Sequence, residues 1–149
     1  MKFEELMDGL RSTLRMPSLE PGRAGVYAIV FDAGLDVELL SLTDRIVLLR
    51  SSVADVPEEE DAREDFYRKH LQYNLLVLRD QTATLALDKD AGKVWLYRTV
   101  DSSQIDVRMF CDLVEDFVNT LEWWRSFESE SQSQTVRPSD MLPFNMLRP

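Results

Sequence analysis

The stretch that decides the fold is residues 57–79, PEEEDAREDFYRKHLQYNLLVLR. Pro57 and the acidic side chains after it suit the first turn of a helix, because proline lacks a backbone donor and negative charge complements the helix dipole. Apolar or aromatic side chains then recur at the spacing of an amphipathic helix. Tyr73, Leu76 and Val77 lie off that stripe. We therefore predict a helix with more than one apolar face, which needs both its own sheet and a second partner, such as another copy of the chain.

Strand-like runs flank this helix on both sides. They are rich in β-branched and aromatic side chains, and the links between them are short enough for an antiparallel meander and a hairpin. The expected strands are residues 26–31, 37–42, 46–53, 83–87 and 94–100.

Two further amphipathic helices are predicted near the ends of the chain. One begins at Phe3 and ends before the Met16-Pro17 step, and the other spans residues 103–127. The fold class is therefore α+β, in the order α-β-β-β-α-β-β-α, with one antiparallel sheet packed against helices. We expect one domain over residues 1–128 and a polar, flexible tail over residues 129–149.

The charge of the chain narrows the class of its partners. The sequence has 149 residues with 17 Lys+Arg and 27 Asp+Glu, a net charge of -10. Such a surface repels phosphate backbones, so we expect no nucleic-acid binding and instead a basic or apolar partner. No apolar run approaches the ~18 residues that cross a bilayer, and the N-terminus lacks the apolar core of a secretory signal. Cys111 is the only cysteine, which suits a reducing cytoplasm.

The sequence contains no constellation typical of a catalytic, metal or cofactor site. His70 is the only histidine and Cys111 the only cysteine, and neither has a sequence partner that would complete a site. Asp88 and Asp90 resemble part of a calcium loop, but Lys93 stands where the glycine is needed. We expect no enzyme, no metal and no cofactor, although a small enzyme with an unrecognised site remains an alternative that loss of turnover on replacing His70 would support.

The order of elements resembles the class I type III secretion chaperones, the family typified by the Tir chaperone. The resemblance runs from about Phe3 to Phe127. It rests on the first helix, on order, length and low pI together, and on five segments. These are GVYAIVFDAGLDVELLSL (25–42), RIVLLRSSVADVPEEE (45–60), HLQYNLL (70–76), ATLALDKDAGKVWLYRTV (83–100) and FCDLVEDFVNTLEWWRSF (110–127).

The resemblance implies a cytoplasmic bacterial homodimer that is not an enzyme. It would bind the N-terminal region of secreted effectors, keep it extended and deliver it to the export apparatus. The export ATPase is a further candidate partner, and no membrane insertion is expected. An alternative is a non-secretory dimeric adaptor or regulator on the same fold, similar to YbjN.

Two sets of residues are the candidate contacts. The first helix and the first strand would bind the effector, and one face of the central helix would form the dimer interface, because a two-fold contact needs a patch that meets itself. The candidate effector-binding residues are Phe3, Leu6, Met7, Leu10, Val26, Ile29 and Phe31. The candidate dimer residues are Tyr67, His70, Leu71, Asn74, Leu75 and Leu78.

Overall fold

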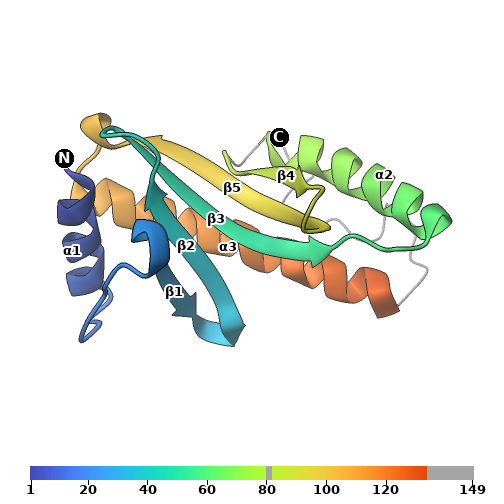
Figure 1. Ribbon diagram of the computed structural model, residues 1–149, viewed down its shortest axis with the longest axis horizontal. Helices are drawn as coiled ribbons and strands as arrows, with labels where there is room; N and C mark the ends of the chain where they lie inside the picture. Colours follow the sequence, from blue (N-terminus) through green and yellow to red (C-terminus); the bar gives the residue numbers. More distant parts are fainter. Residues whose placement is uncertain (80–81, 134–149) are drawn as a thin grey trace. The chain divides into compact units, whose positions relative to one another are not determined.

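The computed structural model describes residues 1–79 and 82–133, and within them the predicted α+β fold and element order are confirmed (Figure 1). Five strands form one antiparallel sheet in the order β1-β2-β3-β5-β4. The elements are α1 (Phe3–Thr13), β1 (Tyr27–Phe31), β2 (Leu35–Ser41), β3 (Ile46–Asp55), α2 (Glu60–Val77), β4 (Thr84–Asp88), β5 (Lys93–Asp101) and α3 (Val107–Ser133). Three short 3₁₀ segments, which the sequence reasoning missed, are η1 (Arg23–Gly25), η2 (Asp32–Gly34) and η3 (Ser102–Gln104).

The chain forms two compact units, and each unit draws on distant parts of the sequence. The first comprises Met1–Ser51 and Tyr97–Asn119, and the second comprises Ser52–Leu96 and Thr120–Pro149. Three elements are divided between the units, each with one part in either unit: β3, β5 and α3. Long-range pairing therefore builds each unit, which a local sequence pattern does not reveal.

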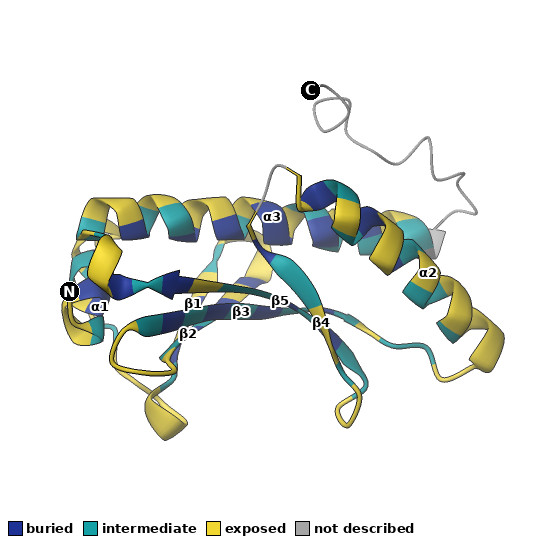
Figure 2. Ribbon diagram, turned by 90° about the horizontal axis from the view of Figure 1, so that it is seen from above, coloured by how far each residue is buried: buried dark blue, intermediate teal, exposed yellow. Residues whose placement is uncertain are grey.

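The meander of the first unit follows the alternation of its strands. Residues of β1 pair with β2 from Tyr27↔Leu39 to Phe31↔Leu35, and β2 pairs with β3 in turn. Ala33 and Gly34 both have positive φ, which closes the β1–β2 turn in three residues. Alternate side chains of β2 and β3 are buried, so one face of these strands carries the core. Figure 2 shows the first half of α3 running alongside them.

The helix α1 is held in the first unit by close packing and by its caps. A Cβ on Gly9 would lie 2.4 Å from a Val107 Cγ atom, so the glycine permits the approach of α1 to the start of α3. Phe3 meets Tyr27 edge to face at 5.4 Å. The helix ends in a turn in which Arg15 has a φ of 54°. This left-handed conformation after a helix is usually adopted by glycine.

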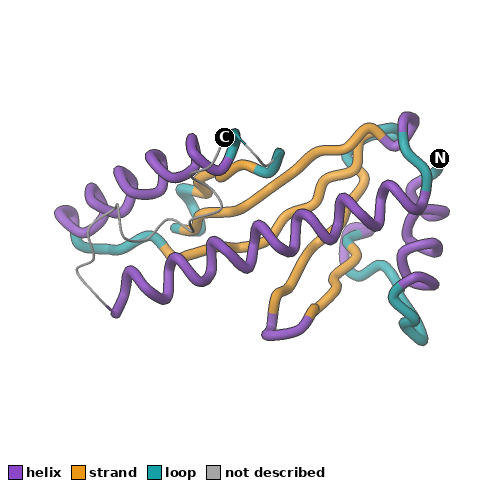
Figure 3. The backbone as a smooth tube through the Cα atoms, turned by 180° about the vertical axis from the view of Figure 1, so that it is seen from behind, coloured by secondary structure: helices purple, strands orange, loops and turns teal. Residues whose placement is uncertain are grey.

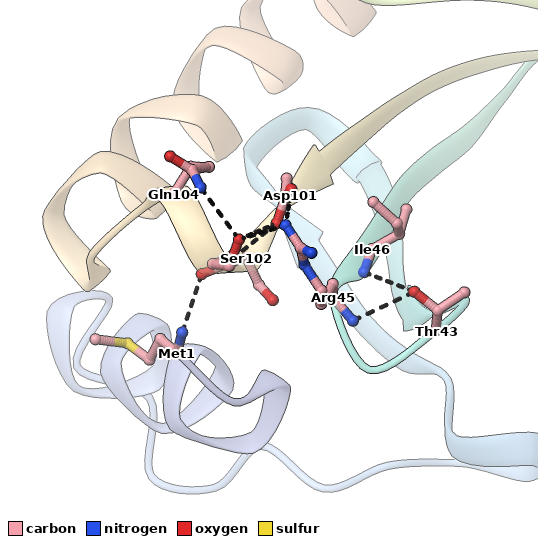
Figure 4. Close-up of polar contacts among 8 residues, drawn as sticks. Met1, Thr43, Arg45, Ile46, Asp101, Ser102 and Gln104 are labelled. Atoms are coloured by element: carbon pink, nitrogen blue, oxygen red, sulfur yellow. Dashed lines mark hydrogen bonds and ion pairs between the residues drawn. The ribbon is translucent and has the colours of Figure 1, made fainter.

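A polar cluster ties the end of β5 to the starts of α1 and β3 in the same unit (Figure 4). The Arg45 guanidinium donates to the Asp101 carboxylate at 2.9 Å and to the Ser103 hydroxyl at 3.0 Å. The amino group of Met1 donates to the Ser102 carbonyl at 3.0 Å. These contacts fix the start of α1 against the sheet, and α1 lines the groove described below.

The second unit is centred on aromatic side chains of α2 and α3. Tyr73 and Val77 of α2 are each 1% exposed, and Trp124 of α3 is fully buried. The Tyr73 and Phe127 rings lie 4.9 Å apart, and Trp123 stacks on Phe127 at 5.6 Å. Burial raises the pKa of the Tyr73 hydroxyl above its ordinary value. This cluster anchors one face of α2, which leaves its other face available.

The helix α3 is longer than the sequence pattern predicts. It is one helix that continues to Ser133, six residues beyond its predicted end at Phe127 (Figure 3). The serines of its last turns donate their hydroxyls to the preceding turn, Ser129 to the Arg125 carbonyl and Ser131 to the Phe127 carbonyl. Polar serine- and glutamate-bearing sequence is therefore compatible with helix here, and residues 134–149 of the predicted tail lie outside the described residues.

Candidate functional site

The outer side of α2 carries a row of exposed leucines, which we call the α2 face. Leu71 is 72% exposed, Leu75 is 70% exposed and Leu78 is 41% exposed. They follow one another at i, i+4 and i+7, so they form one stripe along α2 and its C-cap residue, Leu78. Exposed large apolar side chains in a contiguous row are a feature of surfaces that bind a partner.

The opposite side of α2 is buried, so the helix has the two apolar faces that the sequence predicts. His70, Tyr73 and Val77 form this inner stripe. The predicted dimer residues are therefore distributed over both sides of the helix. Leu71, Leu75 and Leu78 are exposed, Tyr67 and Asn74 are half-buried, and His70 is 6% exposed.

His70 is held inside the second unit by both of its ring nitrogens. Nδ1 lies 2.7 Å from the Phe66 carbonyl, and Nε2 contacts the Glu128 carboxylate of α3. The ring also stacks on Trp124 at 5.8 Å. These contacts join α2 to the end of α3, so His70 has a structural role.

A shallow hollow borders the α2 face where α2 meets the edge strand β4. Asn74 accepts the Leu85 backbone N–H at 3.1 Å and donates to the Thr84 hydroxyl at 3.2 Å, so it fixes β4 against the helix. The hollow has a volume of about 90 Å³. Its lining is mostly apolar and consists of Tyr67, His70, Leu71, Asn74, Leu85, Ala86, Leu87 and Val94.

The first unit contains a larger opening between the end of α1 and the first half of α3, which we call the α1–α3 groove. Its volume is about 320 Å³. Its floor is apolar and its rim includes two carboxylates. The lining residues are Leu10, Thr13, Leu14, Phe31, Cys111, Asp112, Val114, Glu115 and Val118.

The helical repeat explains why these residues meet in the groove. Leu10, Thr13 and Leu14 share one side of α1, because they are three and four residues apart. Cys111, with the lining residues three, four and seven positions after it, forms the matching stripe of α3. Phe31 closes the groove from the end of β1. Two helix stripes and one strand end therefore form a single concave surface.

Only two of the predicted effector-binding residues line the α1–α3 groove, and most of the others are interior. Leu6, Met7, Leu10 and Ile29 are at most 3% exposed, and the other three are half-buried. Of the set, Leu10 and Phe31 line the α1–α3 groove, and Phe3 packs on Tyr27.

Sequence reasoning did not associate Leu14 or the α3 residues with the predicted effector site. The signal that could have found them is the second apolar stripe of α3, at Cys111, Val114 and Val118, beside its core stripe. Pairing that stripe with α1 requires the tertiary structure, since about 100 residues separate the two segments.

The part of the chain that the structure describes contains no cluster of three or more side chains suited to hold a metal ion. In the same part, every helix is too short or too polar to traverse a lipid bilayer.

Comparison with known proteins identifies a matching protein family. The sequence model of the Tir chaperone protein (CesT) family matches residues 5–125. A search of curated proteins finds no match to the sequence.

Three of the solved structures with a similar fold are complexes of two proteins, and two of these are described as chaperone complexes. A chain of the ExsC–ExsE complex has a TM-score of 0.64 and 23% identity, over 85% of this chain and 96% of that chain. A chain of the HopA1–SchA chaperone–effector complex has a TM-score of 0.63 and 18% identity, over 83% and 93%. A chain from the Yersinia pestis type III secretion chaperone SycH with a stable fragment of YscM2 has a TM-score of 0.56 and 15% identity, over 78% and 93%.

Proposed function

This chain belongs to the Tir chaperone protein (CesT) family and is a chaperone of type III secretion effectors, and we propose that it acts as a homodimer in the bacterial cytoplasm. In this proposal it binds the N-terminal region of an effector, keeps that region extended and delivers it to the export apparatus. The observation that carries the function is the family match, which extends from α1 well into α3.

The α2 face supports the homodimer. Leu71 and Leu75 are the most exposed leucines among the described residues, and they lie on a helix whose other side is already packed. A two-fold axis beside α2 would bring the same leucines of two copies together. Burial of an exposed leucine side chain contributes roughly 1.5–3 kcal/mol, so a few such contacts from each copy favour association.

Two features of the first unit support binding of an extended client. The strand β1 lies at one edge of the sheet, so its outer backbone groups can pair with an added strand. Val30 of this strand is 72% exposed. The α1–α3 groove provides a site for client side chains. The net charge of -10 favours a client segment that is basic or apolar.

We infer no catalytic role for His70. Both ring nitrogens are engaged by groups of the same chain, the Phe66 carbonyl and the Glu128 carboxylate. A general base needs a nitrogen within reach of its substrate, and this ring is 6% exposed. These contacts support a binding protein over an enzyme.

The proposal can be tested by capture followed by reconstitution. The tagged protein would be recovered from its native bacterium under conditions that induce secretion, and bound proteins would be identified by mass spectrometry. The N-terminal ~100 residues of each candidate would then be co-expressed with the chaperone, and the mass of the complex measured by light scattering. We expect about two chaperone copies per effector segment, as a two-fold dimer requires.

A secretion assay provides the functional control. Deleting the gene should abolish export of the captured effector and spare export of an effector that was not captured, and the wild-type gene should restore it. Capture of cytoplasmic proteins alone, with secretion unchanged in the deletion strain, would contradict the chaperone function and favour the adaptor alternative.

A further inference from the structure

The α1–α3 groove is lined by negatively charged side chains in addition to its apolar floor. Asp112 and Glu115 are exposed carboxylates at its rim, three residues apart on α3, so they lie on the same side of the helix. The residues that line the groove include no lysine, arginine or histidine. Within the described residues, neither carboxylate forms an ion pair. The lining of the groove therefore carries two carboxylates and no cationic side chain.

The apolar part of the groove is open at the end of α1. Leu14 remains 39% exposed although it faces the groove, and Phe31 is half-buried. Leu10 and Val114 are at most 2% exposed and form the closed floor. A volume of about 320 Å³ suits one or two aliphatic side chains better than a large ligand, because it is at the lower end of the ~300–1,000 Å³ of small-molecule sites.

From this arrangement we propose that the groove selects an amphipathic effector segment in which a large aliphatic side chain stands next to lysine or arginine. The aliphatic side chain would enter between Leu14, Phe31 and Val118, and the cationic side chain would meet Asp112 and Glu115. The inference rests on the proposed chaperone function and adds a specificity to it. An aliphatic segment flanked by acidic residues would place like charges together at the rim, which is unfavourable.

The chain contains a natural reporter for occupancy of the groove. Cys111 lines it, is half-buried and is the only cysteine of the sequence. A segment seated in the groove covers the thiol, so the rate of its reaction with a thiol reagent falls as the groove fills. The reporter distinguishes the groove from other acidic parts of the surface, where a cationic peptide could bind without covering Cys111.

The test uses the full-length protein and two synthetic peptides of 15 residues. Both carry the same leucines, and the residues next to each leucine are lysines in one peptide and glutamates in the other. We expect the lysine peptide to protect Cys111 and the glutamate peptide to protect it at least about tenfold more weakly, since two partly screened ion pairs together change affinity by about that factor. Replacement of Leu14 by serine should weaken protection by the lysine peptide.

A matched pair of double variants separates local charge from net charge. Asp112→Asn with Glu115→Gln removes the rim carboxylates, whereas Glu20→Gln with Glu122→Gln removes two exposed carboxylates outside the groove. We expect about a tenfold loss of protection in the first pair and little change in the second. Equal losses in both pairs, equal protection by both peptides, or no protection of the wild-type thiol would each overturn the proposal. Effector capture and export are measured separately, so the chaperone function can stand if this specificity fails.

Discussion

The side-chain oxygen of Asn74 accepts the backbone N–H of Leu85 at 3.1 Å. Leu85 belongs to β4, an edge strand of the sheet, and such strands present unpaired backbone groups to solvent and to other chains. A side chain of α2 therefore provides a hydrogen-bond acceptor for a backbone N–H of this edge strand. Asn74 also bonds to the Thr84 hydroxyl, so one residue joins the helix that carries the α2 face to the sheet.

We predict that Asn74→Ala destabilises the protein by about 1–3 kcal/mol, because it leaves the half-buried Leu85 N–H and Thr84 hydroxyl without their partner. Asn74→Asp should cost less, since it keeps an acceptor for Leu85. Urea denaturation at one fixed protein concentration measures the free energy of unfolding. Gln72→Ala, at an exposed position of α2, is the control and should change it by under about 0.5 kcal/mol. Equal effects of Asn74→Ala and Gln72→Ala would show that the link contributes nothing.

The α2 face gives a prediction for the oligomeric state. Leu71→Asp and Leu75→Asp should each convert the proposed dimer to a folded monomer, because a charge buried at an interface costs several kcal/mol while an exposed aspartate costs an isolated chain little. Size-exclusion chromatography with light scattering measures the mass, and circular dichroism reports folding. Met109→Asp provides the control, since Met109 is an exposed apolar residue of α3 in the other unit, 48% exposed. Dimers that persist in both leucine variants would place the interface elsewhere.

The α2 helix also illustrates what the sequence can and cannot predict. Periodicity predicts a helix with two apolar faces, because both faces carry apolar residues at helical spacing. It does not show which face is buried. The stripe through Leu71 and Leu75 looks as apolar as the stripe through Tyr73 and Val77, yet the first is exposed and the second is interior. Packing against α3, distant in sequence, decides between them.

The α1–α3 groove could not be predicted from the sequence, for a related reason. Leu10 and Phe31 belong to the predicted effector-binding set, but that set also includes interior residues such as Leu6 and Ile29. A hydrophobic spacing identifies the side of α1 that is apolar without showing where the neighbouring helix stops covering it. The carboxylates Asp112 and Glu115 have the composition of an ordinary solvated helix face, so only their position beside the apolar floor distinguishes them.

The contact between α1 and α3 gives a prediction about packing. Gly9→Ala should destabilise the protein, although alanine is the better helix former by about 1 kcal/mol, because the new methyl would lie 2.4 Å from a Val107 Cγ atom and valine has little rotamer freedom. We expect a net loss of about 1–2 kcal/mol, measured by urea denaturation. The double variant Gly9→Ala with Val107→Ala should recover part of that loss relative to Val107→Ala alone. A more stable Gly9→Ala variant would mean that α1 can shift without cost.

The polar cluster of the first unit gives a prediction about pH. Hydrogen bonds from the Ser103 hydroxyl and backbone N–H, together with Arg45, hold the pKa of the Asp101 carboxyl below its ordinary value. A carboxyl with a lower pKa in the folded state stabilises the protein above its unfolded pKa, roughly 3.9, and this contribution is lost as the pH falls through the folded pKa. We therefore expect wild type to be more stable than Asp101→Asn at pH 7 and the difference to shrink below about pH 4. Urea denaturation of both proteins between pH 7 and pH 2.5 measures it, with Asp90→Asn, at an exposed position of the β4–β5 turn, as the control. A difference that is constant over this range, or one that grows as the pH falls, would show that these hydrogen bonds do not favour the charged form of Asp101.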